Sequence, residues 1–197
     1  MRTVAAFDFD GTLTRRDSLV PFLAELVGWR RTLAGVALVA PGMRRDRDAA
    51  KERLLTRLVR GMPYAQVAEA GERYGKELAR TLRPEMRARL EWHRAQGHEV
   101  VIVSASLDVY LEPVAHELAV DALLCTKLEV DEHGRCTGRM LGGNCRGEAK
   151  AVRLREHVGD GELTLYAYGD SSGDDAMLEM AHHPTRYRRR FGVTRRP

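Results

Sequence analysis

The stretch Ala6-Phe7-Asp8-Phe9-Asp10-Gly11-Thr12-Leu13-Thr14 decides how the rest of the chain is interpreted. It continues a short apolar run that is long enough for a buried parallel strand, and two carboxylates one residue apart follow that run. Since alternate residues of an extended chain point to one side, Asp8 and Asp10 can both reach a ligand beyond the strand's carboxyl end. Gly11 allows the backbone to approach an anion closely, and Thr12 adds a hydroxyl and an N–H group. Taken alone, these residues are also compatible with a simple turn.

Polar side chains also follow later apolar runs. Val101-Ile102-Val103 leads into Ser104, and another run leads into the carboxylates Asp170 and Asp174, while Lys150 follows a glycine-rich turn. The carboxyl ends of parallel strands meet at one edge of a sheet, so a nucleophile, an anion anchor and metal ligands are expected to gather there. Together these motifs favour a functional site over an isolated turn.

With these motifs the chain resembles the haloacid dehalogenase superfamily, in its phosphoserine phosphatase-like branch. Four motifs match in order across nearly the whole chain: Asp8-Phe9-Asp10-Gly11-Thr12, Ser104, Lys150, and Gly169-Asp170 with Asp174. The resemblance implies an α/β fold, with a Rossmann-like parallel sheet, helices on both faces and a small α-helical cap inserted after the first strand. The expected units are a catalytic core of residues 1–16 and 81–185, a cap of residues 17–80 and a basic C-terminal tail of residues 186–197.

Hydrophobic periodicity and helix-breaking residues predict the individual elements. In the cap, helical segments are expected at residues 19–27, 32–39, 46–60 and 64–80. In the core, helices are expected from Pro84 to about residue 96 and at residues 108–119, 148–157 and 174–181, with strands at 99–103 and 163–168 and a β-hairpin over 123–141. His182-His183 is interpreted as a loop. Gly192 to Pro197 lack the usual last strand, and the tail is predicted to be disordered.

The resemblance also implies a role for each catalytic residue. Asp8 is the expected nucleophile that forms an aspartyl-phosphate. Asp10 is expected to protonate the leaving oxygen and later to deprotonate the attacking water. Ser104 and Lys150 are expected to bind and neutralise the transferred phosphoryl group. The implied phosphate-binding set is Gly11, Thr12, Ser104, Ala105 and Lys150.

A single Mg²⁺ is the implied cofactor, because that ion prefers hard oxygen ligands. By resemblance, Asp170 holds it together with the Asp8 carboxylate and the Asp10 carbonyl. Asp174 is expected to orient a water bound to the metal.

Substrate choice is expected to lie in the cap. Phosphoserine phosphatases carry a Glu soon after the nucleophile motif and an Arg in the cap. Asp17 occupies the first place here, and Lys51 or Arg53 lies near the second. Ser104-Ala105-Ser106 replaces their Ser-Gly-Gly pattern, and Gly173 stands where they place an Asn. These departures argue against phosphoserine and favour another small-molecule or lipid-head-group phosphate.

The charge distribution separates the tail from the rest. The formal net charge is +4, but six Arg and no acid lie in residues 186–197, so the remainder is close to neutral. A nucleic-acid partner is therefore not expected, whereas the Arg-rich tail is a candidate for peripheral contact with anionic lipid.

Cysteine usage and the chain's start favour a cytoplasmic protein. Cys125, Cys136 and Cys145 are odd in number and lack a C-x-x-C spacing, which argues against a disulfide framework and a zinc site. No secretory leader pattern opens the sequence, and the apolar cap segments are shorter than the roughly 20 residues that a bilayer requires. The sequence makes no prediction of oligomeric state.

The function expected from the sequence is hydrolysis of a phosphomonoester, dependent on Mg²⁺ and passing through an aspartyl-phosphate. A phosphotransferase or phosphomutase would carry the same motifs and differ only in the acceptor. A non-catalytic phosphate-binding protein ranks last, because it would not need the catalytic carboxylates.

Overall fold

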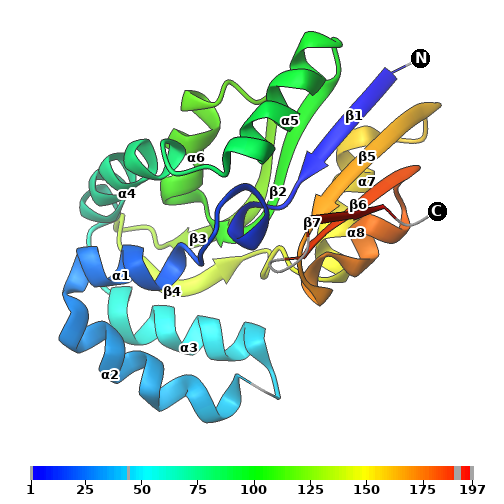
Figure 1. Ribbon diagram of the computed structural model, residues 1–197. Coiled ribbons are helices and arrows are strands. Elements are labelled where there is room, and N and C mark those ends of the chain that lie inside the picture. The colour runs from blue at the N-terminus through cyan, green and yellow to red at the C-terminus, as the bar shows by residue number, and fades with distance from the viewer. Residues whose placement is uncertain (1, 44, 189–191, 196–197) are drawn as a thin grey trace.

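The computed structural model describes residues 2–43, 45–188 and 192–195, and the strands among them form one seven-stranded sheet in the order β4-β3-β2-β1-β5-β6-β7 (Figure 1). The strands are β1 (Arg2–Phe7), β2 (Glu99–Leu107), β3 (Ala122–Val130), β4 (Cys136–Leu141), β5 (Leu163–Gly169), β6 (His183–Arg188) and β7 (Gly192–Arg195). β1 lies at the centre and runs parallel to β2 and β5, while β4 and β7 are antiparallel to their neighbours. The predicted α/β class is confirmed.

The helices follow the predicted pattern closely. Those before β2 are α1 (Leu19–Val27), α2 (Trp29–Val39), α3 (Arg47–Val59), α4 (Tyr64–Ala79) and α5 (Pro84–Ala95). Those after it are α6 (Asp108–Glu117), α7 (Glu148–Val158) and α8 (Asp175–Glu179). The last helix is shorter than the predicted 174–181, because Asp174 belongs to a 3₁₀ turn, Ser172–Asp174, and the helix already ends at Glu179.

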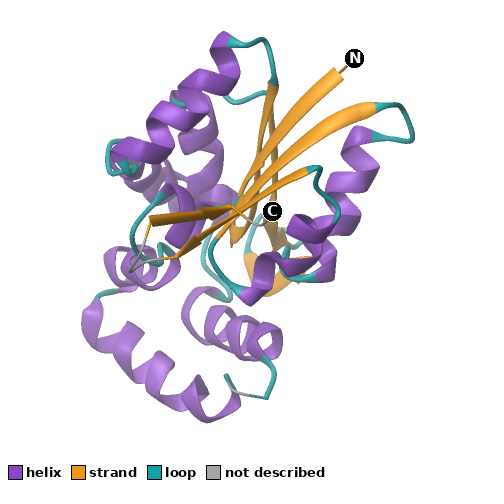
Figure 2. Ribbon diagram, turned by 45° about the vertical axis from the view of Figure 1, so that its right-hand side comes forward, coloured by secondary structure: helices purple, strands orange, loops and turns teal. Residues whose placement is uncertain are grey.

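Helices cover both faces of the sheet (Figure 2). Phe7 belongs to the apolar cluster that packs under α4, α5 and α6, whereas Val4 and Ala6 belong to the cluster under α7 and α8. Residues 4–7 have no exposed surface. A strand covered on both faces needs apolar residues at every position, which is why β1 has a continuous apolar sequence.

The insertion after β1 is anchored to the rest of the molecule at two places. A side chain at Gly138 of β4 would overlap with the backbone of Thr56, so α3 lies directly on the hairpin strand. On α4, a side chain at Gly71 or Gly75 would overlap with backbone carbonyls of α6. Glycines at these positions permit close backbone contact. The division into a separate cap at residues 17–80 stays a prediction.

The C-terminal region differs from the prediction. β6 begins at His183 instead of lying in a loop, and β7 covers Gly192–Arg195 and pairs with β6 in antiparallel register. The expectations of a disordered tail and a missing last strand were therefore wrong for these residues. The arginine-rich sequence has weak strand character on its own, but pairing with β5 and stacking of the Tyr166 ring on the His183 ring stabilise β6. Residues 189–191 and 196–197 of the predicted tail lie outside the described residues.

No helix in the described part of the chain is both long and apolar enough to cross a bilayer.

Candidate active site

The nucleophile motif forms a tight turn at the carboxyl end of β1. The backbone N–H of Asp8 donates to the carbonyl of Tyr168 (2.9 Å), and the chain then winds through a short helical turn, Phe9–Leu13. Gly11 has a φ of 86°, a conformation that glycine adopts without steric strain. A Cβ atom at Gly11 would also overlap with the Asp170 carboxylate. The glycine therefore lets the end of β5 approach the end of β1.

Arg83 holds this turn from the start of α5. Its buried guanidinium donates to the carbonyls of Thr14 and Gly11, each at 3.1 Å, and its backbone N–H donates to the carbonyl of Leu13 (2.9 Å). The sequence analysis gave Arg83 no role, because an arginine directly before Pro84 has the pattern of an ordinary helix start.

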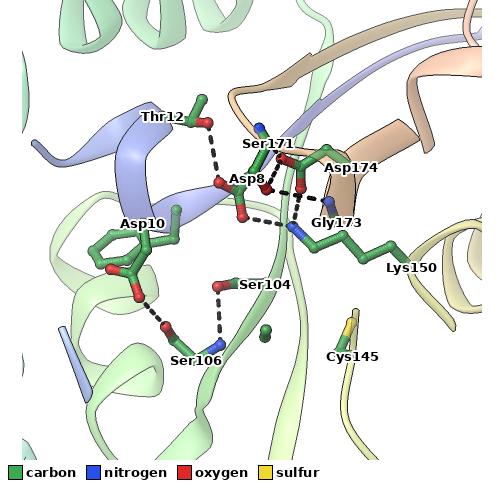
Figure 3. Close-up of polar contacts among 12 residues, drawn as sticks. Asp8, Asp10, Thr12, Ser104, Ser106, Cys145, Lys150, Ser171, Gly173 and Asp174 are labelled. Carbon is green, nitrogen blue, oxygen red and sulfur yellow. Dashed lines mark hydrogen bonds and ion pairs between the residues drawn. The ribbon is translucent and has the colours of Figure 1, made fainter. Parts of the chain in front are cut away.

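Lys150 joins Asp8 and Asp174 in a buried charge cluster (Figure 3). Its Nζ lies 2.5 Å from Asp8 Oδ1 and 2.7 Å from Asp174 Oδ1. Thr12 Oγ1 donates to the other Asp8 oxygen, Oδ2, at 3.0 Å. Burial alone would lower the pKa of Lys150, but the two carboxylates outweigh it and hold that pKa above its usual value. Burial also raises the pKa of Asp8, in spite of the ammonium beside it.

Asp174 positions its neighbours. Its Oδ2 accepts from the backbone N–H groups of Asp170 (3.1 Å) and Ser171 (3.0 Å) and from Ser171 Oγ (3.1 Å). Burial would raise the pKa of Asp174, but Lys150 and these hydrogen bonds hold it below its usual value. Both oxygens of Asp174 thus fix the ammonium and the end of β5, and its predicted role toward a metal-bound water stays a prediction.

Three carboxylates are placed to hold a cation. Oxygen atoms of Asp8, Asp170 and Asp174 lie within 4.8 Å of one another. Carboxylate oxygens are the hard donors that Mg²⁺ prefers. In addition, two buried carboxylates share one ammonium, so a cation would offset the remaining negative charge. The donor set therefore fits a small, oxygen-seeking metal ion.

Asp10 lies apart from this cluster, among hydroxyl groups. Its Oδ2 accepts from Ser106 Oγ (2.6 Å) and from Ser18 Oγ (2.9 Å). Its other oxygen, Oδ1, is buried and has no hydrogen-bond partner among the described residues. Burial, together with the nearby charge of Asp17, raises the pKa of Asp10 to about 6. This carboxyl group can therefore carry a proton near neutral pH.

Ser104 lines the cleft near Asp8 (Figure 3). It is buried within β2, three residues before the strand ends, and its Oγ accepts from the backbone N–H of Ser106 (3.1 Å). A hydroxyl that accepts one hydrogen bond can still donate its own proton, so Ser104 is available to a phosphoryl oxygen. Ala105 lines the same cleft.

A cleft of about 440 Å³ lies between this site and the insertion helices. Its catalytic side is lined by Asp8, Asp10, Ser104, Lys150, Asp170 and Asp174, and its insertion side by Asp17, Lys51 and a set of aliphatic residues. Arg53 is exposed on the outer side of α3 and is not among the residues that line the cleft. The structure thus brings two of the three predicted selectivity residues into the cleft.

Asp17 and Lys51, the two predicted selectivity residues that line the cleft, have different surroundings. Asp17 accepts from the backbone N–H groups of Leu19 (3.1 Å) and Val20 (3.3 Å) and so caps α1. Lys51 donates to the carbonyl of Ala105 and to Asn144 Oδ1 (2.9 Å), which ties α3 to β2 and to the segment between β4 and α7. Burial lowers the pKa of Lys51 to about 8.

Comparison with known proteins agrees with this geometry. A family model described as haloacid dehalogenase-like hydrolase matches residues 5–179. The chain belongs to this family. The family assignment rests on a match that includes all four predicted motifs.

Individual members of the family show how far the similarity extends. The chain is 37% identical to Protein CicA of Caulobacter vibrioides over 183 residues, which cover 90% of this chain and 82% of CicA. It is 30% identical to a probable phosphatase of Mycobacterium tuberculosis over 195 residues, which cover 92% of this chain and 67% of the relative. A crystal structure of a Bordetella pertussis protein of unknown function superposes with a TM-score of 0.77 at 25% identity, over 91% of this chain and 86% of that one. Phosphoserine phosphatases occur among both the similar sequences and the similar folds, which confirms the predicted branch.

Sequence reasoning missed the hydroxyl groups around Asp10. Ser18 has no active-site role in the sequence-based prediction, and Ser106 appears there only as a departure from a family pattern. The useful signal was Ser106 itself, since it stands two residues after Ser104 on the same side of β2 and therefore points into the same cleft.

Proposed function

We propose that the protein is a phosphatase that hydrolyses phosphomonoesters through an aspartyl-phosphate on Asp8. The separation of two carboxylates carries the proposal: Asp8 is held by the Lys150 ammonium, while Asp10 lies among hydroxyls with one buried, unpaired oxygen. These surroundings suit a nucleophile and a proton carrier, respectively. Membership of a hydrolase family and similarity to a probable phosphatase support the reaction class.

In the first step a carboxylate oxygen of Asp8 attacks phosphorus and the bond from phosphorus to the ester oxygen breaks. Asp10 gives its proton to the departing alkoxide, which leaves as an alcohol. Lys150 and the Ser104 hydroxyl stabilise the negative charge on the phosphoryl oxygens. Thr12 holds Asp8 Oδ2 and so orients the carboxylate for attack.

In the second step water attacks the phosphorus of the aspartyl-phosphate. Asp10, now ionised, takes a proton from that water, and the bond between phosphorus and the Asp8 oxygen breaks. Inorganic phosphate leaves, and both carboxyl groups return to their initial state. One group can act as acid and then as base only if its pKa lies near the working pH, as the burial of Asp10 favours.

Mg²⁺ is the proposed cofactor, and the carboxylates of Asp8 and Asp170 and the carbonyl of Asp10 would hold it, with the Asp174 carboxylate beside them. When bound, it supplies positive charge that offsets the phosphate and the carboxylates around it. Asp174 contributes by fixing the Asp170 backbone and the Lys150 ammonium.

The wall of the cleft indicates the type of organic group that the substrate carries. Its insertion side carries the apolar residues Leu19, Val20, Val36, Val39, Met43 and Leu54, together with the charged residues Asp17, Arg47 and Lys51. Such a wall favours a phosphomonoester with an apolar segment and is a poor match for a zwitterionic amino acid such as phosphoserine. Asp17 and Lys51 at its polar end are the proposed selectivity residues. Faster hydrolysis of phosphoserine than of hexyl phosphate by the purified protein would contradict this assignment.

The division of roles is tested by Asp10→Asn with two substrates. The alkoxide of an alkyl phosphate is a poor leaving group without a proton, so the variant should form no aspartyl-phosphate from it. The p-nitrophenolate group leaves without a proton, so p-nitrophenyl phosphate should give a burst of about one nitrophenolate per site and then stall.

Asp8→Asn is the matched control, and it should give no burst with either substrate. Wild-type rates of Asp10→Asn on both substrates would contradict the proposed division. Product analysis in the presence of glycerol separates hydrolysis from phosphotransfer, because a phosphotransferase would yield glycerol phosphate in place of inorganic phosphate.

A further inference from the structure

The outer face of α2 is apolar and unpartnered among the described residues. Its inner face is packed, since Thr32, Gly35 and Val39 are buried and a Cβ at Gly35 would lie 3.0 Å from Leu54 Cδ1 on α3. On the opposite side, exposed apolar residues recur at helical spacing over three turns: Trp29 (58% exposed), Leu33 (55%) and Leu38 (61%), with Ala34 and Ala37 between them. Large side chains exposed together on one helix mark an interaction surface more often than scattered ones do.

This face lies at the outer end of the molecule. In both views α2 is the element farthest from the sheet within the insertion, with α1 and α3 between it and the core (Figures 1 and 2). Met43 continues the apolar surface just beyond the helix and is 44% exposed. No described element covers the face.

The charged residues between Leu26 and Arg45 are all basic. From residue 26 to residue 45 the sequence contains four arginines and no acid, and Arg30 and Arg31 are exposed in the first turn of α2. Arg45 is exposed beyond its end. The nearest acids along the chain, Glu25 and Asp46, lie outside this stretch, and Asp46 accepts from the backbone of α3. An apolar helix face with basic residues at its ends is complementary to an anionic lipid surface.

We propose that the outer face of α2, formed by Trp29, Leu33, Ala34, Ala37 and Leu38 with Arg30 and Arg31, docks the protein on the surface of an anionic bilayer. The helix lies in the plane of the interface, its leucines and tryptophan enter the boundary between head groups and acyl chains, and the arginines contact lipid phosphates. The chain does not span the bilayer in this arrangement.

The position of the catalytic cleft agrees with this docking. Val36 and Val39 of the same helix line the cleft from the inside, and Met43 is both exposed and part of the cleft wall. Docking through α2 therefore brings the aliphatic side of the cleft close to the bilayer. The inference concerns binding and does not depend on the proposed reaction.

Vesicle binding tests the proposal directly. The chain contains two tryptophans, so Trp92→Phe leaves Trp29 as the only tryptophan, whose emission can be excited separately from that of the tyrosines. Vesicles of phosphatidylcholine with phosphatidylglycerol should bind the protein in a co-sedimentation assay and shift the Trp29 emission to shorter wavelength. Vesicles of phosphatidylcholine alone should bind it much more weakly. Absence of binding and of a spectral shift with the anionic vesicles would overturn the proposal.

Variants locate the binding surface. Leu33→Glu/Leu38→Glu should lower partitioning at least about tenfold, because two apolar side chains are withdrawn from lipid. Arg30→Gln/Arg31→Gln should lower it by about fivefold per arginine, since each is worth about 1 kcal/mol at such a surface. Leu141→Glu is the matched control, because Leu141 is an equally exposed leucine (56%) on the hairpin, and it should bind like wild type. Thermal unfolding checks that each variant is folded.

Two results would assign the binding elsewhere and overturn the proposal. Unchanged vesicle binding by the double glutamate variant would show that another basic region binds the vesicles, such as residues 186–197, for which the sequence predicted lipid contact. The second result is a wild-type protein that sediments as a dimer and a double glutamate variant that is monomeric but binds vesicles as well as wild type. It would show that the face pairs with a second copy.

Discussion

Replacing Lys51 by methionine is expected to change the stability of the protein in a way that depends on pH. Burial lowers the pKa of Lys51 from 10.5 to about 8. The folded state therefore binds this proton more weakly than the unfolded state, which reduces the free energy of unfolding wherever the unfolded lysine is charged. At about 1.4 kcal/mol per pH unit, the reduction is about 3 kcal/mol at pH 7. It disappears as the pH rises from 8 to 10.5.

Methionine occupies a similar volume without a charge. The Lys51→Met variant loses two hydrogen bonds, to Ala105 and Asn144, worth about 1 kcal/mol each. Thr126 Oγ1 lies within hydrogen-bond distance of both acceptors, at 2.9 and 2.8 Å, but its single proton can satisfy only one of them. The other acceptor is left without a donor, which raises the total loss to about 3 kcal/mol. The variant should therefore be about as stable as wild type at pH 7 and about 3 kcal/mol less stable at pH 10.5.

Urea unfolding of both proteins over this pH range measures the difference. Other titrating groups are common to the two proteins and cancel when their free energies of unfolding are subtracted. Lys127→Met is the matched control, because Lys127 is an exposed lysine on β3. A Lys51→Met difference that stays constant from pH 7 to pH 10.5 would refute the reasoning.

Three further predictions concern the metal, the nucleophile turn and a buried histidine. Removal of Mg²⁺ by a chelator should abolish turnover and lower the midpoint temperature of thermal unfolding, and Asp170→Asn should remove the stabilisation by Mg²⁺. Ca²⁺ should inhibit the enzyme because its looser coordination misplaces Asp8. Full activity in excess chelator would contradict the predicted metal dependence. Gly11→Ala should lower turnover at least about a hundredfold, because the new Cβ atom displaces Asp170. Gly28→Ala controls for backbone strain, since Gly28 has the same φ of 86° but a Cβ atom there would meet no atom within 4 Å. Equal losses of turnover in both variants would contradict the argument. His93 is buried against Tyr168, and burial lowers its pKa from 6.5 to about 4. The unfolded state takes up a proton that the folded state does not, so the free energy of unfolding should fall by about 3 kcal/mol between pH 6.5 and pH 4. The fall should be less steep in His93→Gln. Equal pH dependence of the free energy of unfolding in the two proteins would contradict the prediction.

The parts of the site that were predictable from the sequence are those fixed by strand ends. Asp8, Ser104 and Asp170 each follow an apolar run, and parallel strands bring such positions to one edge whatever the details of packing. Lys150 meets Asp8 because it lies in the first turn of a helix that packs against that edge. These positions depend on topology, which periodicity and motif order reveal well.

The parts that were not predictable depend on contacts between distant segments. Arg83 reaches the carbonyls of Gly11 and Thr14 from a position about 70 residues later in the chain, and no local pattern encodes that contact. Arg53 was chosen with Lys51 by its sequence position alone. The two residues lie on different sides of α3, and only Lys51 faces the core.

β6 and β7 were missed because their strand character comes from their neighbours. The sequence from His183 to Arg188 contains Pro184 and two arginines, and it gains its conformation by pairing with β5. Propensity is a weak guide at the edge of a sheet, where cross-strand contacts decide the structure.

The central position of β1 has a consequence for the order in which the protein can fold during synthesis. β1 leaves the ribosome before its partners β2 and β5, which end at residues 107 and 169. Until β5 has emerged, the fully apolar residues 4–7 lack one of their two neighbouring strands. At a synthesis rate of about 5–20 residues per second, this interval is roughly 8–35 seconds. The active site therefore assembles only after the emergence of β5.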